Sequence, residues 1–144
     1  MKRQLVIGRS LLGLIFLVAG LSKVFNYAST LNLMRDAGMR GAGLFLPLAI
    51  LVEVGGALAL VTGARVRSAS LLLAAYLVPV TLIFHRFWSV AGEARQIQTI
   101  EFLKNCSIFG GLYLTATYQR ILDSFTSGTV TELRRETFER RRAA

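Results

Sequence analysis

A carboxylate in the middle of a long apolar run is the feature that most constrains this chain. The run covers residues 44–62 (LFLPLAILVEVGGALALVT), enough for a helix to cross the hydrocarbon core of a bilayer. Glu53 lies near its midpoint, where a charged side chain costs about 3 kcal/mol unless it faces protein, water or a partner. Gly55 and Gly56 follow, and small residues let a neighbouring helix approach closely. We therefore expect this helix to form an inner wall of a bundle, with Glu53 turned inward.

Three further apolar runs have lengths suited to crossing a membrane. They cover residues 5–25, 69–84 and 100–118. Only 17% of the 144 residues are charged, against about 25% in a typical soluble domain. The pattern predicts an all-α integral membrane protein, a four-helix transmembrane bundle over residues 1–120 followed by a basic cytoplasmic tail over residues 121–144.

The net charge of +9 has two common interpretations, nucleic-acid binding and membrane topology. The charges lie between the apolar runs and in the tail, and the long runs leave little soluble surface, so we exclude nucleic acid as a partner. With four spans, one side of the membrane collects about ten cations and the other about four. This bias places both termini in the cytoplasm.

The polar connector after the first run contains a short helical pattern, TLNLMRDA, from Thr30 to Ala37. Ser29 or Thr30 would cap its start and Gly38 would end it. We expect a short interfacial helix that lies on the membrane between the first two spanning helices. A second polar loop is expected over residues 89–99, before the last apolar run.

With this topology, the four spanning helices bring a polar cluster into the outer half of the bundle. The cluster consists of Lys23, Glu53, His85, Lys104 and Asn105. One interpretation is structural: polar contacts hold membrane helices together, and Glu53 would pair with Lys104 or with Lys23. The other is functional, because ionisable groups within a membrane are costly enough to indicate a site.

The functional interpretation is a pocket that opens toward the outer leaflet. His85 can donate a hydrogen bond to a carbonyl or carry a proton near neutral pH, and Glu53 would pass that proton deeper. Lys23 or Lys104 would balance the charge. The aromatic side chains expected to line a flat apolar ligand are Phe87, Trp88, Phe102 and Phe109. A quinone head group suits this set, although a proton-coupled carrier would use similar residues.

The chain has one histidine and one cysteine, which restricts the cofactors that it can hold by itself. A haem held by two histidines, a multi-histidine metal cage and an internal disulfide are impossible within one chain. We expect no metal and no intrinsic cofactor, with quinone as the candidate bound molecule. Cys106 is either a small hydrophobe in an apolar helix, which is the commoner case, or a thiol made reactive by the nearby Lys104.

Several short motifs, taken in order, resemble the DoxX family of small bacterial membrane proteins. They are Gly8-Arg9 with Gly13-Leu14-Ile15-Phe16, Ala19-Gly20-Leu21-Ser22-Lys23, Glu53 with Gly55-Gly56, Leu60 with Gly63, His85-Arg86-Phe87-Trp88, Gln98, Phe102-Leu103-Lys104-Asn105 and Gly110-Gly111. The resemblance implies a compact four-helix inner-membrane protein. Its relatives include a membrane subunit of a thiosulfate:quinone oxidoreductase and members of membrane complexes linked to oxidative stress, so the implied role is in membrane redox chemistry.

These observations lead to one preferred function and two alternatives. The preferred function is a redox-associated inner-membrane subunit that binds quinone or a similar small apolar ligand, with proton relay through Glu53 and His85. Lys23, Trp88, Phe102, Lys104 and Asn105 would bind the ligand. The alternatives are a non-catalytic membrane scaffold for a soluble redox partner and a small proton-coupled carrier. Whether the chain is itself an enzyme, as the membrane subunit of an oxidoreductase complex, and whether it forms a homo-oligomer, both stay open.

Overall fold

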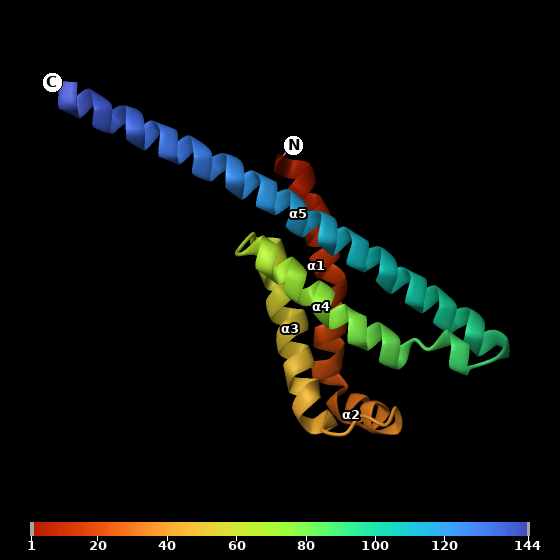
Figure 1. Cartoon of the computed structure of the whole chain (residues 1–144). Coiled ribbons are helices and arrows are strands. Elements are labelled where there is room, and N and C mark those ends of the chain that lie inside the picture. Colours follow the sequence, from red (N-terminus) through yellow and green to blue (C-terminus); the bar gives the residue numbers. More distant parts are fainter. Residues whose placement is uncertain (1, 144) are drawn as a thin grey trace.

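The computed structural model describes the backbone of residues 2–143 and the side chains of residues 3–128. Over these residues the chain is all-helical, as predicted. Its elements in order are α1 (Lys2–Phe25), α2 (Tyr27–Asp36), α3 (Ala42–Thr62), α4 (Val66–Phe84), the short 3₁₀ helix η1 (Phe87–Ser89) and α5 (Gly92–Ala143). Figure 1 shows α1 beside α3 and α4 beside α5, with the second pair crossing the first at an angle.

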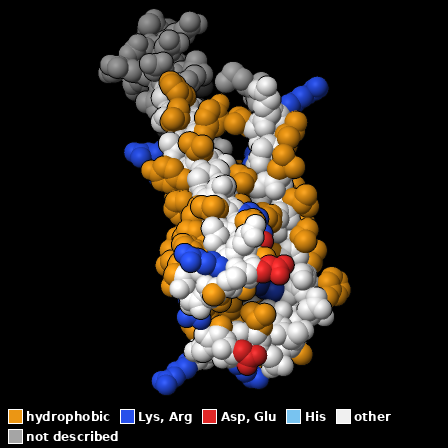
Figure 2. Space-filling model, turned by 90° about the vertical axis from the view of Figure 1, so that its right-hand side faces the viewer, with side chains coloured by type: hydrophobic (Ala, Val, Ile, Leu, Met, Phe, Trp, Pro, Cys, Tyr) orange, Lys and Arg blue, Asp and Glu red, His pale blue; other side chains and the backbone are white. Residues whose placement is uncertain are grey.

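Three segments of the described chain are long and apolar enough to cross a membrane. They are Arg3–Phe25, Ala42–Thr62 and Val66–Ser89. Their outward sides carry many exposed large hydrophobic residues, and hydrophobic side chains cover much of the face in Figure 2. α5 is outside this set, and its apolar stretch contains the polar residues Glu101, Lys104 and Asn105.

The short helix after α1 is present, but its predicted start is wrong. α2 begins at Tyr27, and Asn26 is its N-cap residue. Ser29 and Thr30 do not cap it, because both hydroxyls donate hydrogen bonds to the carbonyl of Asn26. Only one residue therefore separates α1 from α2. Met34 is the buried residue of α2, and it packs in a small cluster with residues at the start of α3.

The polar loop predicted over residues 89–99 is also wrong, since α5 begins at Gly92. The sequence EARQIQ that follows consists largely of good helix formers, and Glu93 in the first turn complements the positive end of the helix dipole. Lys104 therefore lies three turns into α5 rather than near its start. The connection between α4 and α5 is reduced to η1 and a few flanking residues.

Glycines allow the helices to pass very close to one another. A Cβ at Gly20 of α1 would lie 2.7 Å from Val54 Cγ2 and 3.2 Å from the Cβ of Glu53 on α3. A Cβ at Gly56 would lie 2.7 Å from the side chain of Leu73 on α4. The level of Glu53 is thus a point where α1 and α3 lie almost backbone to backbone. Around these contacts, four helices contribute to the buried core, with Phe16, Ala57, Leu60, Leu73 and Leu112 among its members.

We predict that Gly20→Ala is less stable than the matched Gly8→Ala. Both substitutions add the same helix propensity on α1, but a Cβ at Gly8 would have no atom within 4 Å, so only Gly20→Ala overpacks the interface. The difference in free energy of unfolding should be about 1–3 kcal/mol, measured by chemical unfolding in mild detergent. Equal stabilities would mean that α1 and α3 do not approach closely at this level.

Candidate ligand-binding site

Glu53 is buried and fully engaged by two side chains from other helices. The residue is 3% exposed. The ammonium group of Lys23 on α1 donates to both carboxylate oxygens, at 2.9 Å each. The hydroxyl of Tyr76 on α4 donates to Oε1 at 2.7 Å. One carboxylate thus joins three helices, and its charge is compensated by Lys23, whose side chain is 26% exposed while that of Glu53 is 4% exposed.

The local sequence explains why Lys23 reaches Glu53. Gly20 lies one turn before Lys23 on the same face of α1, and the absence of a side chain there brings α1 against α3. The lysine stem then spans the short gap to the carboxylate, with its ammonium group also 3.5 Å from the carbonyl of Ala19. Of the two partners predicted for Glu53, the structure shows Lys23.

A cavity of about 190 Å³ lies directly beside this ion pair. Its polar lining residues are Lys23, Glu53, Tyr76, His85, Lys104 and Asn105, and the rest of its wall is apolar side chains of α1, α4 and α5. The structure therefore brings together five of the predicted site residues, from four helices or their ends, around one small space. We call it the polar cavity.

A larger cavity of about 680 Å³ adjoins the polar cavity between α2, α3 and α4. The two share Lys23, Tyr76, Val80 and His85 in their walls. Apart from these residues and Thr30, the larger cavity is lined by apolar side chains. Leu33 and Phe45 at its rim are 58% and 50% exposed, so it opens at the apolar surface of the protein. We call it the apolar cavity.

His85 follows the last turn of α4 and is positioned by α5. Its Nδ1 lies 3.0 Å from Oε1 of Gln98, so a proton on Nδ1 would make this a hydrogen bond. In that tautomer Nε2 is an acceptor, and no described residue occupies it. The imidazole therefore has one nitrogen fixed to the protein and the other available at the junction of the two cavities.

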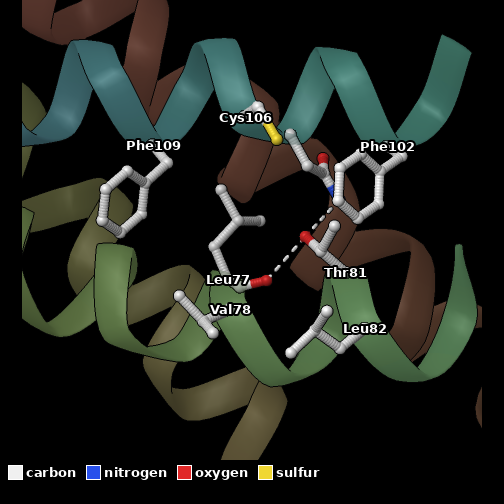
Figure 3. Close-up of a pocket in the computed structure, with 8 residues that line it drawn as sticks. Leu77, Val78, Thr81, Leu82, Phe102, Cys106 and Phe109 are labelled. Atoms are coloured by element: carbon white, nitrogen blue, oxygen red, sulfur yellow. Dashed lines mark hydrogen bonds between the residues drawn. The ribbon is translucent and has the colours of Figure 1, made fainter. Parts of the chain in front are cut away.

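Asn105 has a structural partner of its own. Its amide donates to the hydroxyl of Thr81 at 3.0 Å, and Thr81 in turn donates to the carbonyl of Leu77 at 2.7 Å. Figure 3 shows this chain of hydrogen bonds at the wall of a third cavity, of about 250 Å³, between α4 and α5. Phe102, Cys106 and Phe109 from α5 line this third cavity. The pair Asn105 and Thr81 fixes α5 against α4 beside the polar cavity.

Trp88 and Phe102, which were also predicted for the site, do not line the polar cavity. Trp88 is 54% exposed and forms edge-to-face ring contacts with Phe87 and Phe102. This aromatic cluster covers the junction of η1 and α5 and does not line either of the two adjoining cavities. Lys104 does line the polar cavity, but its ammonium group pairs with Glu101 on the same helix, where both side chains are well exposed.

Two residues of this site, Tyr76 and Gln98, were not predicted. Glu53 and Tyr76 lie at nearly equal distances along the chain from Ala64, in the turn between α3 and α4, so an antiparallel helix pair brings them to the same depth. A buried tyrosine hydroxyl also usually finds a partner. These two facts together could have identified Tyr76. Gln98 is among the residues that resemble the DoxX pattern, but its polar neighbours favour a loop, so no role in the site was assigned to it.

The described residues contain no group of three His, Cys, Asp or Glu side chains arranged to hold a metal ion. The polar groups around the single carboxylate are ammonium, phenol, imidazole and amide groups. This is a set suited to hydrogen bonding with the oxygens of an organic ligand.

Two inner-membrane proteins of known sequence are similar to this chain over most of its length. Inner membrane protein YqjF of Escherichia coli (strain K12) is 33% identical over 111 residues, which cover 77% of this chain and 80% of YqjF. Inner membrane protein YphA of the same organism is 31% identical over 112 residues, with 78% and 80% covered. With the three apolar spans, these similarities define a multi-pass inner-membrane protein.

A sequence profile named DoxX matches residues 4–86. The chain belongs to the DoxX family. No solved structure matches it. The matched region contains Lys23, Glu53, Tyr76 and His85, whereas Gln98, Lys104 and Asn105 on α5 lie beyond it.

We predict that Lys23→Met lowers the free energy of unfolding by about 3 kcal/mol or more, because it leaves the buried carboxylate of Glu53 without its counter-charge. The double variant Lys23→Met/Glu53→Leu should recover much of this loss, since apolar side chains can replace a buried ion pair. Chemical unfolding in detergent measures both.

The control is Lys104→Met, which removes a lysine from a well-exposed pair and should change stability by less than about 1 kcal/mol. Equal losses for Lys23→Met and Lys104→Met would contradict a stabilising role for the Lys23–Glu53 pair.

Proposed function

We propose that this protein binds a quinone, or a similar small apolar ligand with a polar ring, at the junction of the two cavities. The observation that supports this most directly is that Lys23, Tyr76 and His85 line both spaces. A ring would occupy the polar cavity and its tail the apolar cavity. The larger volume, about 680 Å³, is within the range of small-molecule sites, which are mostly apolar with a few placed polar groups.

Each polar residue has a distinct role in this proposal. Lys23 presents its ammonium group to a ligand oxygen, and the Tyr76 hydroxyl, whose proton is donated to Glu53, would accept a hydrogen bond from a quinol hydroxyl. Glu53 lies behind both side chains and holds them in position. His85 offers Nε2 to the ligand and is oriented through Nδ1 by Gln98. Lys104 and Asn105 close the side of the polar cavity formed by α5.

The same residues can move protons in a redox cycle. Reduction of a quinone to a quinol takes up two electrons and two protons, and the electrons would come from a partner redox protein. His85, held through Nδ1 by Gln98, would exchange a proton with the ligand through its other ring nitrogen. Tyr76 and Glu53 form a second hydrogen-bonded route from the ligand into the protein. In this way the chain would act as a redox-associated membrane subunit with relay through Glu53 and His85.

We further propose that the first part of α5 is a fourth span and that both termini are cytoplasmic. Leu112 and Ala116 of α5 are buried in the core, and the helix packs along α4. Residues 1–120 would then form the bundle and residues 121–144 a basic cytoplasmic tail. The cation count favours this orientation, which puts the polar cavity toward the periplasmic side.

The topology predicts that a fluorescent protein fused after Ala144 will fluoresce in intact cells, because it would remain in the cytoplasm. Alkaline phosphatase fused at the same place should be inactive, since it folds only in the periplasm. The reverse pattern would contradict an even number of spans with a cytoplasmic N-terminus.

Binding can be followed through Trp88, the single tryptophan, whose fluorescence a nearby quinone should quench. We predict that two substitutions each raise the Kd for ubiquinone-1, measured by this quenching, about tenfold or more. They are Ala49→Phe, which fills the apolar cavity, and His85→Ala, which removes a ligand contact. Ala75→Phe is the control, because it adds the same ring at an exposed position of α4 outside both cavities. This variant should bind ubiquinone-1 with the Kd of the wild type.

Quenching that is equal in the wild type, Ala49→Phe and His85→Ala would show that the quinone does not occupy these cavities. Absence of quenching in every variant, together with recovery of a soluble redox protein on the wild-type chain, would favour the non-catalytic scaffold instead.

A further inference from the structure

A second candidate site lies on α1 far from the polar cavity and does not depend on the proposed function. We propose that Arg9 binds a phosphate group at this other end of the bundle. Arg9 and Lys23 are separated by about 21 Å along the helix axis, given the rise of an α-helix. Figure 1 shows this part of α1 where it passes α5, close to the turn between α3 and α4.

The guanidinium group of Arg9 has no acceptor among the described residues. Its Nε is completely shielded from solvent and makes no hydrogen bond. No ion pair or side-chain hydrogen bond to Arg9 is formed anywhere in residues 3–128. Shielding Nε from water without a hydrogen-bond partner is costly, so an anion from outside the described chain would stabilise the guanidinium group.

Gly63 fixes the position of this guanidinium group. A Cβ at Gly63 would lie 2.8 Å from Nη2 and 2.9 Å from Nη1 of Arg9. The residue also has a φ of 85°, a conformation that glycine adopts at no steric cost. The group therefore rests closely against the C-terminal end of α3. The negative end of that helix dipole compensates part of its charge, but the arginine donates no hydrogen bond there.

The space around Arg9 is a cavity of about 410 Å³ between α1, α4 and α5. Its polar lining comes from Gln4, Arg9, Thr115, Tyr118 and Gln119, and no carboxylate lines it. The nearest acidic side chain along this part of α5, Asp123, accepts a hydrogen bond from Gln119. A guanidinium group with a shielded, unpaired Nε and with neutral amide and phenol groups beside it is a set that suits phosphate oxygens.

The depth of Arg9 also suits a phosphate. The phosphate site does not depend on the orientation of the protein in the membrane, because either end of a spanning helix meets a headgroup layer. Arg9 is about 10 Å along α1 from Lys2, so its long side chain reaches the boundary between hydrocarbon and headgroups. Arg65 and Arg67 follow in the adjacent turn and add positive potential at this end. The phosphate can belong to an anionic phospholipid or be a free phosphate.

The test is native mass spectrometry of the full-length protein in detergent with phosphatidylglycerol, and separately a thermal-shift titration with inorganic phosphate. We expect the wild type to retain phosphatidylglycerol and Arg9→Gln to retain at least about tenfold less. Arg95→Gln is the matched control: it causes the same loss of net charge at an exposed arginine near the start of α5 that does not line the cavity, and should change retention less than about twofold.

Two milder variants keep the test decisive should Arg9→Gln fail to fold. Arg9→Lys keeps the charge but loses the fork, and Tyr118→Phe removes one hydroxyl at similar volume; each should weaken retention severalfold. Retention of lipid that phosphate cannot displace assigns the site to a phospholipid headgroup, whereas a shift with phosphate alone assigns it to a free phosphate. Equal retention in the wild type, Arg9→Lys and Tyr118→Phe, with no effect of phosphate, would overturn the proposal.

Discussion

The structure depends on one requirement: the carboxylate of Glu53 must be compensated inside an apolar bundle. Lys23 supplies the charge and Tyr76 a hydrogen bond, so three helices are tied at one depth. Such a pair stabilises little by itself, because removing two charges from water offsets most of their attraction. We interpret its stronger effect as one on specificity, since a rotation of α1 or α3 that separated the pair would leave an unpaired charge in the bundle.

The glycines and the ion pair act together. Gly20 lets α1 touch α3 beside Glu53, and one turn later Lys23 can reach the carboxylate. Gly56 does the same between α3 and α4, one turn from Glu53 on the other side. The close approach excludes lipid from the carboxylate, and the space that remains on the side of α4 and α5 is the polar cavity. The site is thus a direct result of where small residues are placed.

Much of this could be predicted from the sequence, and the misses have physical causes. The depth of Glu53, the inward direction of its side chain and the convergence of Lys23, His85 and Asn105 follow from helix length and from the cost of buried charge. The start of α5 was misplaced because polar residues near Arg95 resembled a loop, although they are good helix formers. Trp88 was expected beside the ligand, but its ring packs on Phe87 and Phe102 instead, a choice that depends on tertiary contacts.

The sequence did not indicate which of the two lysines, Lys23 or Lys104, pairs with Glu53. Both lysines were expected at a depth from which they could pair with Glu53. Which of them does so depends on whether another acidic side chain lies nearby. Lys104 has Glu101 one turn away on its own helix, whereas Lys23 has no acidic neighbour on α1. The lysine without a local partner is the one that crosses to the buried carboxylate.

The exposed rim of the apolar cavity determines whether the proposed ligand would enter from lipid or from water. Leu33 and Phe45 are apolar and exposed, so in a membrane the proposed ligand would enter the cavity there from the bilayer and not from water. The quantity that governs saturation is then the mole fraction of the molecule in the surrounding lipid. A weak intrinsic affinity would suffice in a membrane, because partitioning already concentrates apolar compounds in the phase from which they enter.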